Sequence, residues 1–155
     1  MGSVIPLKKS ANSAYLDLKN LVEDKLNKVH SLIELKLQSK VKLIKLMSEH
    51  HFSSGGKRLR ALLTLGSSRL AGYSLGTRDV NLAACVELIH SATLLHADVI
   101  DESKLRRGIK TTNSIWGDRS WRLVGDYLLS RCFEVMVDDG DLEILKLLSS
   151  ASAKI

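Results

Sequence analysis

The sequence is poor in the residues that build strand-rich or membrane-spanning proteins. It has one proline, Pro6, and 5% aromatic residues in a chain of 155. Few aromatic side chains disfavour a β-sandwich, and the scarcity of proline leaves long stretches free to be helical. No window approaches the ~18 to 20 continuous apolar residues that a membrane-spanning helix needs. The composition therefore predicts a soluble, all-α protein with no transmembrane segment.

The sequence also has only two cysteines, and they form no metal-binding or redox motif. Cys85 and Cys132 each lie in an apolar run, with no CxxC spacing and no secretory signal before them. We expect both to be buried, reduced thiols, which indicates a cytoplasmic protein.

Basic residues outnumber acidic ones, 23 to 17, which gives a formal net charge of +6. This excess suits an anionic partner such as a phosphate, a nucleic acid or a lipid headgroup. We expect no nucleic acid, because the lysines near the N-terminus lack interleaved aromatic residues and no recognition motif occurs. The length allows one domain with a hydrophobic core.

Apolar residues recur at spacings of three and four along most of the chain, which predicts helices. Residues 1–12 are expected to be a disordered lead, and residues 13–50 one amphipathic helix. The further helices predicted are 57–71, 80–101, from Trp116 or Trp121 to 137, and 141–153. Asp79 is the expected N-cap of the helix over 80–101, and residues 103–113 are expected to form a loop.

A glycine-rich basic segment, Gly55–Arg60 (GGKRLR), leads into the helix predicted over 57–71. It puts three cations in the first turn, where the helix dipole is already positive. A bound anion would stabilise them, because glycines and free backbone N–H groups allow close approach. The segment therefore indicates either a phosphate-binding turn or a solvated basic turn.

The apolar helix over 80–101 carries polar groups that need partners. They are Glu87, His90, His96, Asp98 and Asp101. Asp98 and Asp101 could hold Mg²⁺ together with substrate phosphates, or they could pair with Arg106 and Arg107. His90 could be a ligand or a hydrogen-bonded core residue. Taken together, cations, carboxylates and a Gly-Gly helix start describe a diphosphate site bridged by Mg²⁺.

Four motifs together resemble a known family. They are GGKRLR at 55–60, ELIHSATLLHADVIDES at 87–103, LRRG at 105–108 and VGDYLLS at 124–130. In order and spacing they resemble the motifs of the trans-prenyl diphosphate synthases of the polyprenyl or octaprenyl type. The resemblance covers the chain from Ser53 onward. It implies an all-α, homodimeric enzyme that joins isopentenyl diphosphate to an allylic diphosphate with Mg²⁺, in isoprenoid (quinone side-chain) biosynthesis.

The resemblance also implies roles for particular residues. Those implied to bind isopentenyl diphosphate are Lys57, Arg60, His90 and Arg107. Arg106 would face the allylic diphosphate, and Asp98 and Asp101 would bind Mg²⁺. Ala92 would leave room for a long product to pass down the bundle, or it could simply pack within the helix.

The sequence departs from the family pattern at two positions and in length. Ala97 stands where the first aspartate of the DDxxD motif is expected, and Ala61 where proline is expected. Family members are longer, and their second aspartate-rich motif has no counterpart here. We therefore expect an isoprenoid-synthase bundle truncated to its N-terminal helices, in which residues 13–155 form the N-terminal half of the domain.

Two functions remain open at this point. The first is a polyprenyl diphosphate synthase-like protein that is inactive as this shorter chain. The second is a non-catalytic helical module that binds diphosphate or pairs with another subunit.

Overall fold

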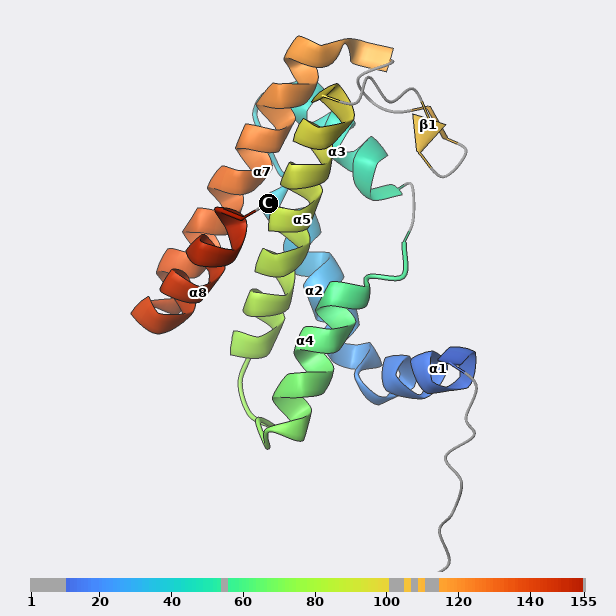
Figure 1. The fold of residues 1–155 in the computed structure, drawn as a ribbon. Helices are drawn as coiled ribbons and strands as arrows, with labels where there is room; N and C mark the ends of the chain where they lie inside the picture. Colours follow the sequence, from blue (N-terminus) through green and yellow to red (C-terminus); the bar gives the residue numbers. More distant parts are fainter. Residues whose placement is uncertain (1–10, 54–55, 101–104, 107–108, 111–114, 155) are drawn as a thin grey trace, which may run out of the picture.

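The computed structural model describes residues 11–53, 56–100, 105–106, 109–110 and 115–154 (Figure 1). Its helices are α1 (Ala11–Leu21), α2 (Glu23–Lys36), α3 (Lys42–Ser53), α4 (Leu59–Leu70), α5 (Arg78–Ile100), α7 (Asp118–Asp139) and α8 (Leu142–Ser152). Two short strands, β1 (Leu105–Arg106) and β2 (Ile109–Lys110), pair antiparallel within the segment predicted as a loop. The prediction of an all-α fold is confirmed.

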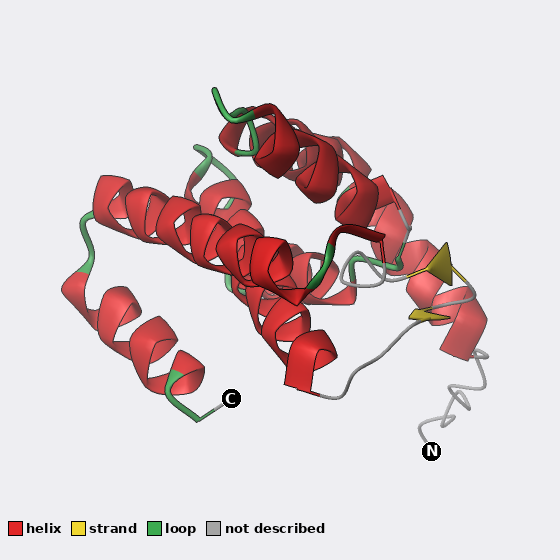
Figure 2. Cartoon of the chain, turned by 90° about the horizontal axis from the view of Figure 1, so that it is seen from above, coloured by secondary structure: helices red, strands yellow, loops and turns green. Residues whose placement is uncertain are grey.

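Helix α5 is the centre of the bundle. It packs along α7 over most of its length and also contacts α4 and α2 (Figure 1). Seen from above, α8 lies apart from the other helices, joined to α7 by a short turn (Figure 2). The sequence predicts this central place for α5, because its first turns are apolar nearly all round.

The prediction of one helix over 13–50 is wrong, because the segment forms three helices. The first break falls at Val22, which is buried and has non-helical backbone angles, so that α1 turns away to pack on α4. The second break follows Leu37. There the Ser39 hydroxyl accepts a hydrogen bond from the Val41 N–H, and the Tyr127 hydroxyl donates to the Gln38 carbonyl at 2.6 Å. The local Ser39 bond competes with helix continuation, and the Tyr127 bond fixes the break against α7.

The expected N-cap role of Asp79 is also wrong. Asp79 lies inside α5 as its second residue and is buried. Its carboxylate pairs with Lys25 of α2 at 2.5 Å and also accepts from the Val80 N–H. Asp79 therefore joins two helices rather than starting one.

The α7–α8 turn forms where the sequence predicts it. Gly140 adopts a left-handed conformation with φ of 70°, which glycine tolerates best, and ends α7. The Asp141 side chain then accepts hydrogen bonds from the N–H groups of Glu143 and Ile144, which makes it the N-cap of α8.

The core lies between α5 and its neighbours. It includes Leu88, Leu95, Trp121 and Leu128, all at most 1% exposed. Cys85 and Cys132 are free and buried, as expected, and they face each other across α5 and α7. A hydrogen bond with Cys132, together with burial, raises the pKa of the Cys85 thiol far above its usual range.

One helix of the described residues is long and apolar enough to cross a membrane. By length and apolar composition alone, Arg78–Asp98 of α5 passes that test. More than half of the segment is buried against other helices of the bundle. Its apolar character is therefore accounted for by its place in the core.

Candidate functional site

The basic turn that precedes α4 is held in an unusual backbone conformation. Arg58, the N-cap of α4, is left-handed, with φ of 46° and ψ of 41°, and among the described residues no other non-glycine has positive φ. The Arg58 side chain makes no capping hydrogen bond at this end of the helix. The N–H groups of Leu59 and Arg60 are therefore not covered by the cap residue, which leaves donors for an anion at the helix start.

The first turn of α4 is fixed to the middle of α5 by one hydrogen bond. The Ala61 N–H donates to Glu87 Oε1 at 3.0 Å, and Glu87 is only 6% exposed. The bond exists because residue 61 is alanine, since proline has no N–H to donate. It brings the basic turn beside the part of α5 that carries His90, one turn after Glu87.

This bond also settles what Glu87 does. The sequence singles out Glu87 as a buried acid in need of a partner, and its partner is the α4 backbone rather than a ligand. The sequence contains one sign of this bond, because Ala61, which has an N–H to donate, stands where the family pattern has proline. Without the fold, however, nothing links residues 61 and 87.

Lys57 and Arg60 of the basic turn are exposed and Arg58 is half-buried, and two of these cations lie against aromatic rings. Lys57 Nζ lies 5.4 Å from the centroid of the Tyr15 ring, and the Arg58 guanidinium lies 4.9 Å from that of Phe52. Within the described part of the chain, neither Lys57 nor Arg60 forms an ion pair. Two cations without an ion pair leave positive charge available to an anion.

A small cavity adjoins this turn. It has a volume of about 220 Å³, and Gly56, Lys57 and Arg58 line it together with Tyr15 and Lys19 of α1 and His30 of α2. Its lining includes no carboxylate. The helices before residue 41 thus contribute to the surroundings of the basic turn.

The polar residues of α5 divide between two faces. His90 and Ala97 are half-buried, whereas Asp98 is 3% exposed. The carboxylate missing at position 97 would therefore sit on a more open part of α5 than Asp98, which is buried. Asp101 and Arg107 lie outside the described residues. The backbone of Arg106 lies in β1, and its side chain is outside the described part.

Two further residues singled out by the sequence have places within the packing. His96 pairs with Asp126 of α7 at 3.3 Å and lies over Gly125, whose lack of a side chain makes room for the imidazole. Ala92 is 1% exposed and belongs to the hydrophobic core. This burial fits helix packing, so the product-tunnel role of Ala92 stays a prediction.

The described residues provide few ligands for a metal. No group of three His, Cys, Asp or Glu side chains suitable for a metal ion occurs among them. Asp98 supplies one hard oxygen donor, and the sequence adds Asp101. Such a donor set fits Mg²⁺, which commonly takes one or two carboxylates and completes its coordination with water and substrate phosphates.

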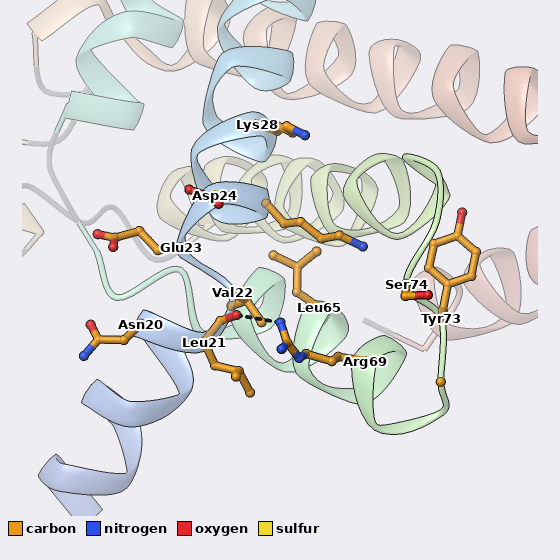
Figure 3. Close-up of a pocket in the computed structure, with 12 residues that line it drawn as sticks. Asn20, Leu21, Val22, Glu23, Asp24, Lys28, Leu65, Arg69, Tyr73 and Ser74 are labelled. Carbon is orange, nitrogen blue, oxygen red and sulfur yellow. Dashed lines mark hydrogen bonds between the residues drawn. The ribbon is translucent and has the colours of Figure 1, made fainter.

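A larger cavity, of about 700 Å³, lies at the other end of α4 (Figure 3). Its walls carry charges of both signs, including Glu23, Asp24, Lys28 and Arg69. Arg69 is already used within it, donating to the Leu21 carbonyl at 3.0 Å. None of the sequence motifs reaches this cavity, so we do not assign the functional site to it.

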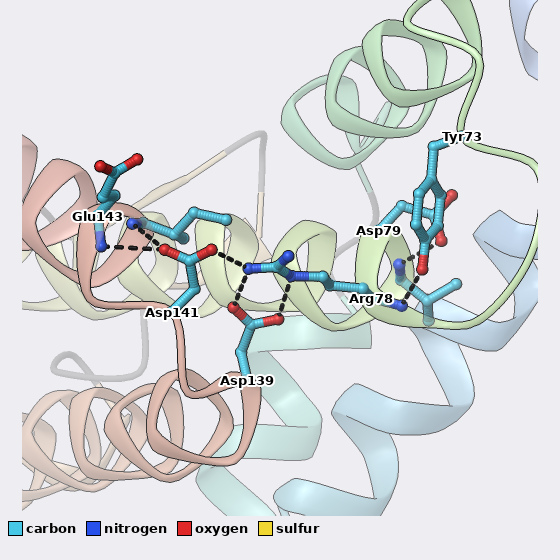
Figure 4. Close-up of polar contacts among 8 residues, drawn as sticks. Tyr73, Arg78, Asp79, Asp139, Asp141 and Glu143 are labelled. Atoms are coloured by element: carbon cyan, nitrogen blue, oxygen red, sulfur yellow. Dashed lines mark hydrogen bonds and ion pairs between the residues drawn. The ribbon is translucent and has the colours of Figure 1, made fainter.

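The N-terminal end of α5 carries the most extensive charge cluster of the described residues (Figure 4). Arg78 donates to both carboxylate oxygens of Asp139, at 2.7 and 3.0 Å, and to Asp141 at 2.5 Å. The guanidinium and the N–H groups of Ile144 and Glu143 hold the pKa of the Asp141 carboxyl below its ordinary value. These contacts tie α5 to the α7–α8 turn and leave no charge for a ligand.

The chain is an all-α bundle in which an exposed basic turn is docked on the central helix α5. Comparison with known proteins identifies its family. The sequence model of the polyprenyl synthetase family matches residues 41–155, and the chain belongs to this family.

The relatives are named as prenyl diphosphate synthases of several product lengths. The chain is 42% identical over 123 residues to octaprenyl diphosphate synthase of Escherichia coli, an alignment that covers 79% of this chain and 38% of that protein. It is 41% identical over 123 residues to the geranyl-diphosphate-specific all-trans-nonaprenyl-diphosphate synthase of Rhodobacter capsulatus, covering 77% and 37%. The chain thus spans less than half the length of these relatives.

Solved structures agree with the sequence comparison. A decaprenyl diphosphate synthase from Rhodobacter capsulatus matches with a TM-score of 0.86 and 44% identity over 90% of this chain and 43% of that one. A polyprenyl synthase from Caulobacter crescentus, solved with calcium and isoprenyl diphosphate, matches with a TM-score of 0.88 and 42% identity, covering 96% and 44%. The fold is therefore that of the isoprenoid synthases, as the motifs indicate.

Proposed function

We propose that this chain is the substrate-binding part of a polyprenyl diphosphate synthase. Such an enzyme condenses isopentenyl diphosphate with an allylic diphosphate, in an isoprenoid pathway that supplies quinone side chains. The observation that carries the proposal is the Ala61–Glu87 hydrogen bond, which fixes the basic turn beside His90. The names of the octaprenyl and nonaprenyl relatives support a long-chain product.

Isopentenyl diphosphate binds at the basic turn in this proposal. The residues that hold it are Lys57, Arg60, His90 and Arg107. The absence of ion pairs at Lys57 and Arg60 in the described part of the chain supports this role, because a diphosphate would supply the missing counter-charge. Charge-assisted hydrogen bonds from lysine and arginine to phosphate are among the stronger ones in proteins.

The allylic diphosphate binds further along α5, facing Arg106 and the aspartates. The helical rise separates His90 from Asp98 by about 12 Å along the axis. This spacing leaves room for two diphosphates and the carbon atoms between them. Asp98 and Asp101 would hold Mg²⁺ against the allylic diphosphate, where the ion would neutralise charge on the departing group.

In the reaction, the residues of this chain stabilise the charge of the departing diphosphate and position isopentenyl diphosphate. Arg106 stabilises the allylic diphosphate as its C–O bond breaks and the electron pair leaves with the diphosphate. Lys57, Arg60, His90 and Arg107 hold isopentenyl diphosphate so that its double bond faces the allylic carbocation. The new C–C bond forms there, and loss of a proton restores a double bond.

We propose that these residues bind substrates without supporting measurable condensation alone. The 155 residues contain no second aspartate-rich motif, and Ala97 replaces one ligand of the first. The reduced, buried Cys85 and Cys132 support a cytoplasmic location.

We also propose a helical partner, a second copy of the chain, on the surface of α7 and α8. Phe133, Val137, Leu142 and Leu147 are 49–77% exposed there, and α8 has no buried residue. Sedimentation of the wild-type chain and of a Phe133→Lys variant tests this, since pairing through this surface predicts a dimer that the variant weakens. A monomeric wild-type chain would contradict it.

An elongation assay tests the proposed function. The chain is incubated with Mg²⁺, isopentenyl diphosphate and farnesyl diphosphate, alone and as Ala97→Asp, and the products are separated by chain length. We expect binding of isopentenyl diphosphate and no elongation by the wild-type chain. Elongation would contradict the requirement for the second motif, and failure to bind would contradict the diphosphate site itself.

A further inference from the structure

We infer that Tyr15, on α1, is a positioning residue for Lys57 and so tunes the affinity of the basic turn for a diphosphate. This inference rests on the proposed function, in which Lys57 contacts isopentenyl diphosphate. Tyr15 lies outside residues 41–155, which match the family, and no sequence motif includes it.

Tyr15 contacts Lys57 in two ways. Its hydroxyl donates to the Lys57 carbonyl at 3.4 Å, and its ring centroid lies 5.4 Å from Lys57 Nζ. One contact restrains the backbone of the basic turn, and the other restrains the ammonium through the negative face of the ring. Lys57 follows two glycines, so its own chain neighbours restrain it little.

Helix α1 is itself anchored on α4, which gives Tyr15 a fixed place. Leu18, one turn after Tyr15, packs on Gly66, where an added Cβ would lie 2.9 Å from Leu18 Cδ1. At the end of α1, the Leu21 carbonyl accepts a hydrogen bond from Arg69. The contacts between α1 and α4 therefore hold Tyr15 in a fixed position relative to the basic turn, which leads directly into α4.

The physical effect is preorganisation. A free lysine side chain loses much of its rotamer freedom when it binds an anion. The Tyr15 ring removes part of that freedom beforehand, so that less is lost on binding. Tyr15 therefore acts through Lys57 and does not touch the diphosphate.

Calorimetric titration with isopentenyl diphosphate tests this through a double-mutant cycle. Tyr15→Leu should weaken binding about two- to fivefold, the size of an exposed cation–π contact. Tyr15→Phe keeps the ring and should bind close to wild type. In a Lys57→Ala background, Tyr15→Leu should have no further effect.

A matched control comes from the same type of contact elsewhere. Lys25 Nζ lies 5.2 Å from the centroid of the Tyr73 ring, near the far end of α4. Tyr73→Leu should leave the affinity for isopentenyl diphosphate unchanged even where it lowers the Tm.

Three results would overturn the inference. Wild-type affinity in Tyr15→Leu, with weaker binding in Lys57→Ala, would remove the role of Tyr15 while leaving the proposed site. An equal loss from Tyr15→Leu with and without Lys57 would mean that Tyr15 acts by another route. Wild-type affinity in both Lys57→Ala and Arg60→Ala would contradict the proposed site on which the inference rests.

Discussion

The two ends of α5 use charged residues in different ways. At the N-terminal end, Arg78 is bonded to Asp139 and Asp141, and Asp79 to Lys25, so that each charge has a partner within the chain. Toward the other end, the basic turn docked beside the middle of α5 carries Lys57 and Arg60, and neither forms an ion pair within the described residues.

This difference separates stabilising charges from binding charges. Paired charges at the first end hold helices together, whereas unpaired cations at the second add little to stability and are available to an anion. Substitutions at the first end should therefore change stability and leave binding unchanged. Substitutions at the second should do the reverse.

The largest expected effect is at the binding end. Arg60→Ala should weaken isopentenyl diphosphate binding about 10- to 100-fold, the loss of one charged hydrogen bond of about 1.5–3 kcal/mol. The Tm without ligand should stay close to wild type, because the Arg60 side chain is exposed and unpaired among the described residues. Calorimetry and thermal melts measure the two quantities. A fall in Tm with unchanged affinity would mean that Arg60 stabilises the fold and does not bind the ligand.

At the stabilising end, Asp139→Ala should lower the free energy of unfolding by about 1–3 kcal/mol. The Asp139 side chain is 4% exposed and supplies two of the three hydrogen bonds that Arg78 makes to carboxylates. Urea unfolding measures the loss, and the affinity for isopentenyl diphosphate should not change. Val137→Ala is a nearby control on the same helix, with an exposed side chain and a small expected effect.

These two ends were not equally predictable from the sequence. The Gly55–Arg60 motif predicts the basic turn because a short segment contains it. The Arg78–Asp139 and Asp79–Lys25 pairs join residues far apart in the chain, and no local pattern links them. The same limit explains the wrong N-cap at Asp79 and the unforeseen partner of Glu87.

The N-terminal helices show a second limit. The apolar spacing over 13–50 predicts helix correctly, but it does not predict the breaks at Val22 and after Leu37. Neither glycine nor proline marks these positions, and the breaks depend on contacts with α4 and α7. By contrast, Gly140 and Asp141 mark the α7–α8 turn by their own conformational preferences. The roles of Asp101 and Arg107 stay predictions, since both lie outside the described residues.

Ala97→Asp should add a metal-dependent contact at the binding end. A carboxylate at position 97, on the more open face of α5, should strengthen farnesyl diphosphate binding about tenfold in the presence of Mg²⁺, as one further ligand to the ion. Titrations with and without EDTA measure this gain. Ala97→Asn, which lacks the charge, is the matched control and should gain less. Equal gains without Mg²⁺ would contradict a metal role for this face.

The smallest expected effect is a pH dependence at the stabilising end. Arg78 and the backbone N–H of Ile144 lower the pKa of Asp141 below its ordinary value of 3.8. A lowered carboxyl pKa contributes stability that is present above the ordinary pKa and is lost as the pH falls through the folded-state value. Lowering the pH below about 4 should therefore reduce the Tm of the wild type more than that of Asp141→Asn, which keeps the N-cap without the charge. Thermal melts at a series of pH values measure the difference. The same dependence of Tm on pH in the wild type and in Asp141→Asn would contradict a stabilising role for the Asp141 charge.

Titration of isopentenyl diphosphate into the 155-residue chain tests the central claim most directly. If the basic turn is a diphosphate site, the chain should show saturable binding at one ligand per chain and a higher Tm with ligand, and both should be lost in a Lys57→Ala, Arg60→Ala double variant. No heat and no rise in Tm at millimolar ligand would contradict the claim.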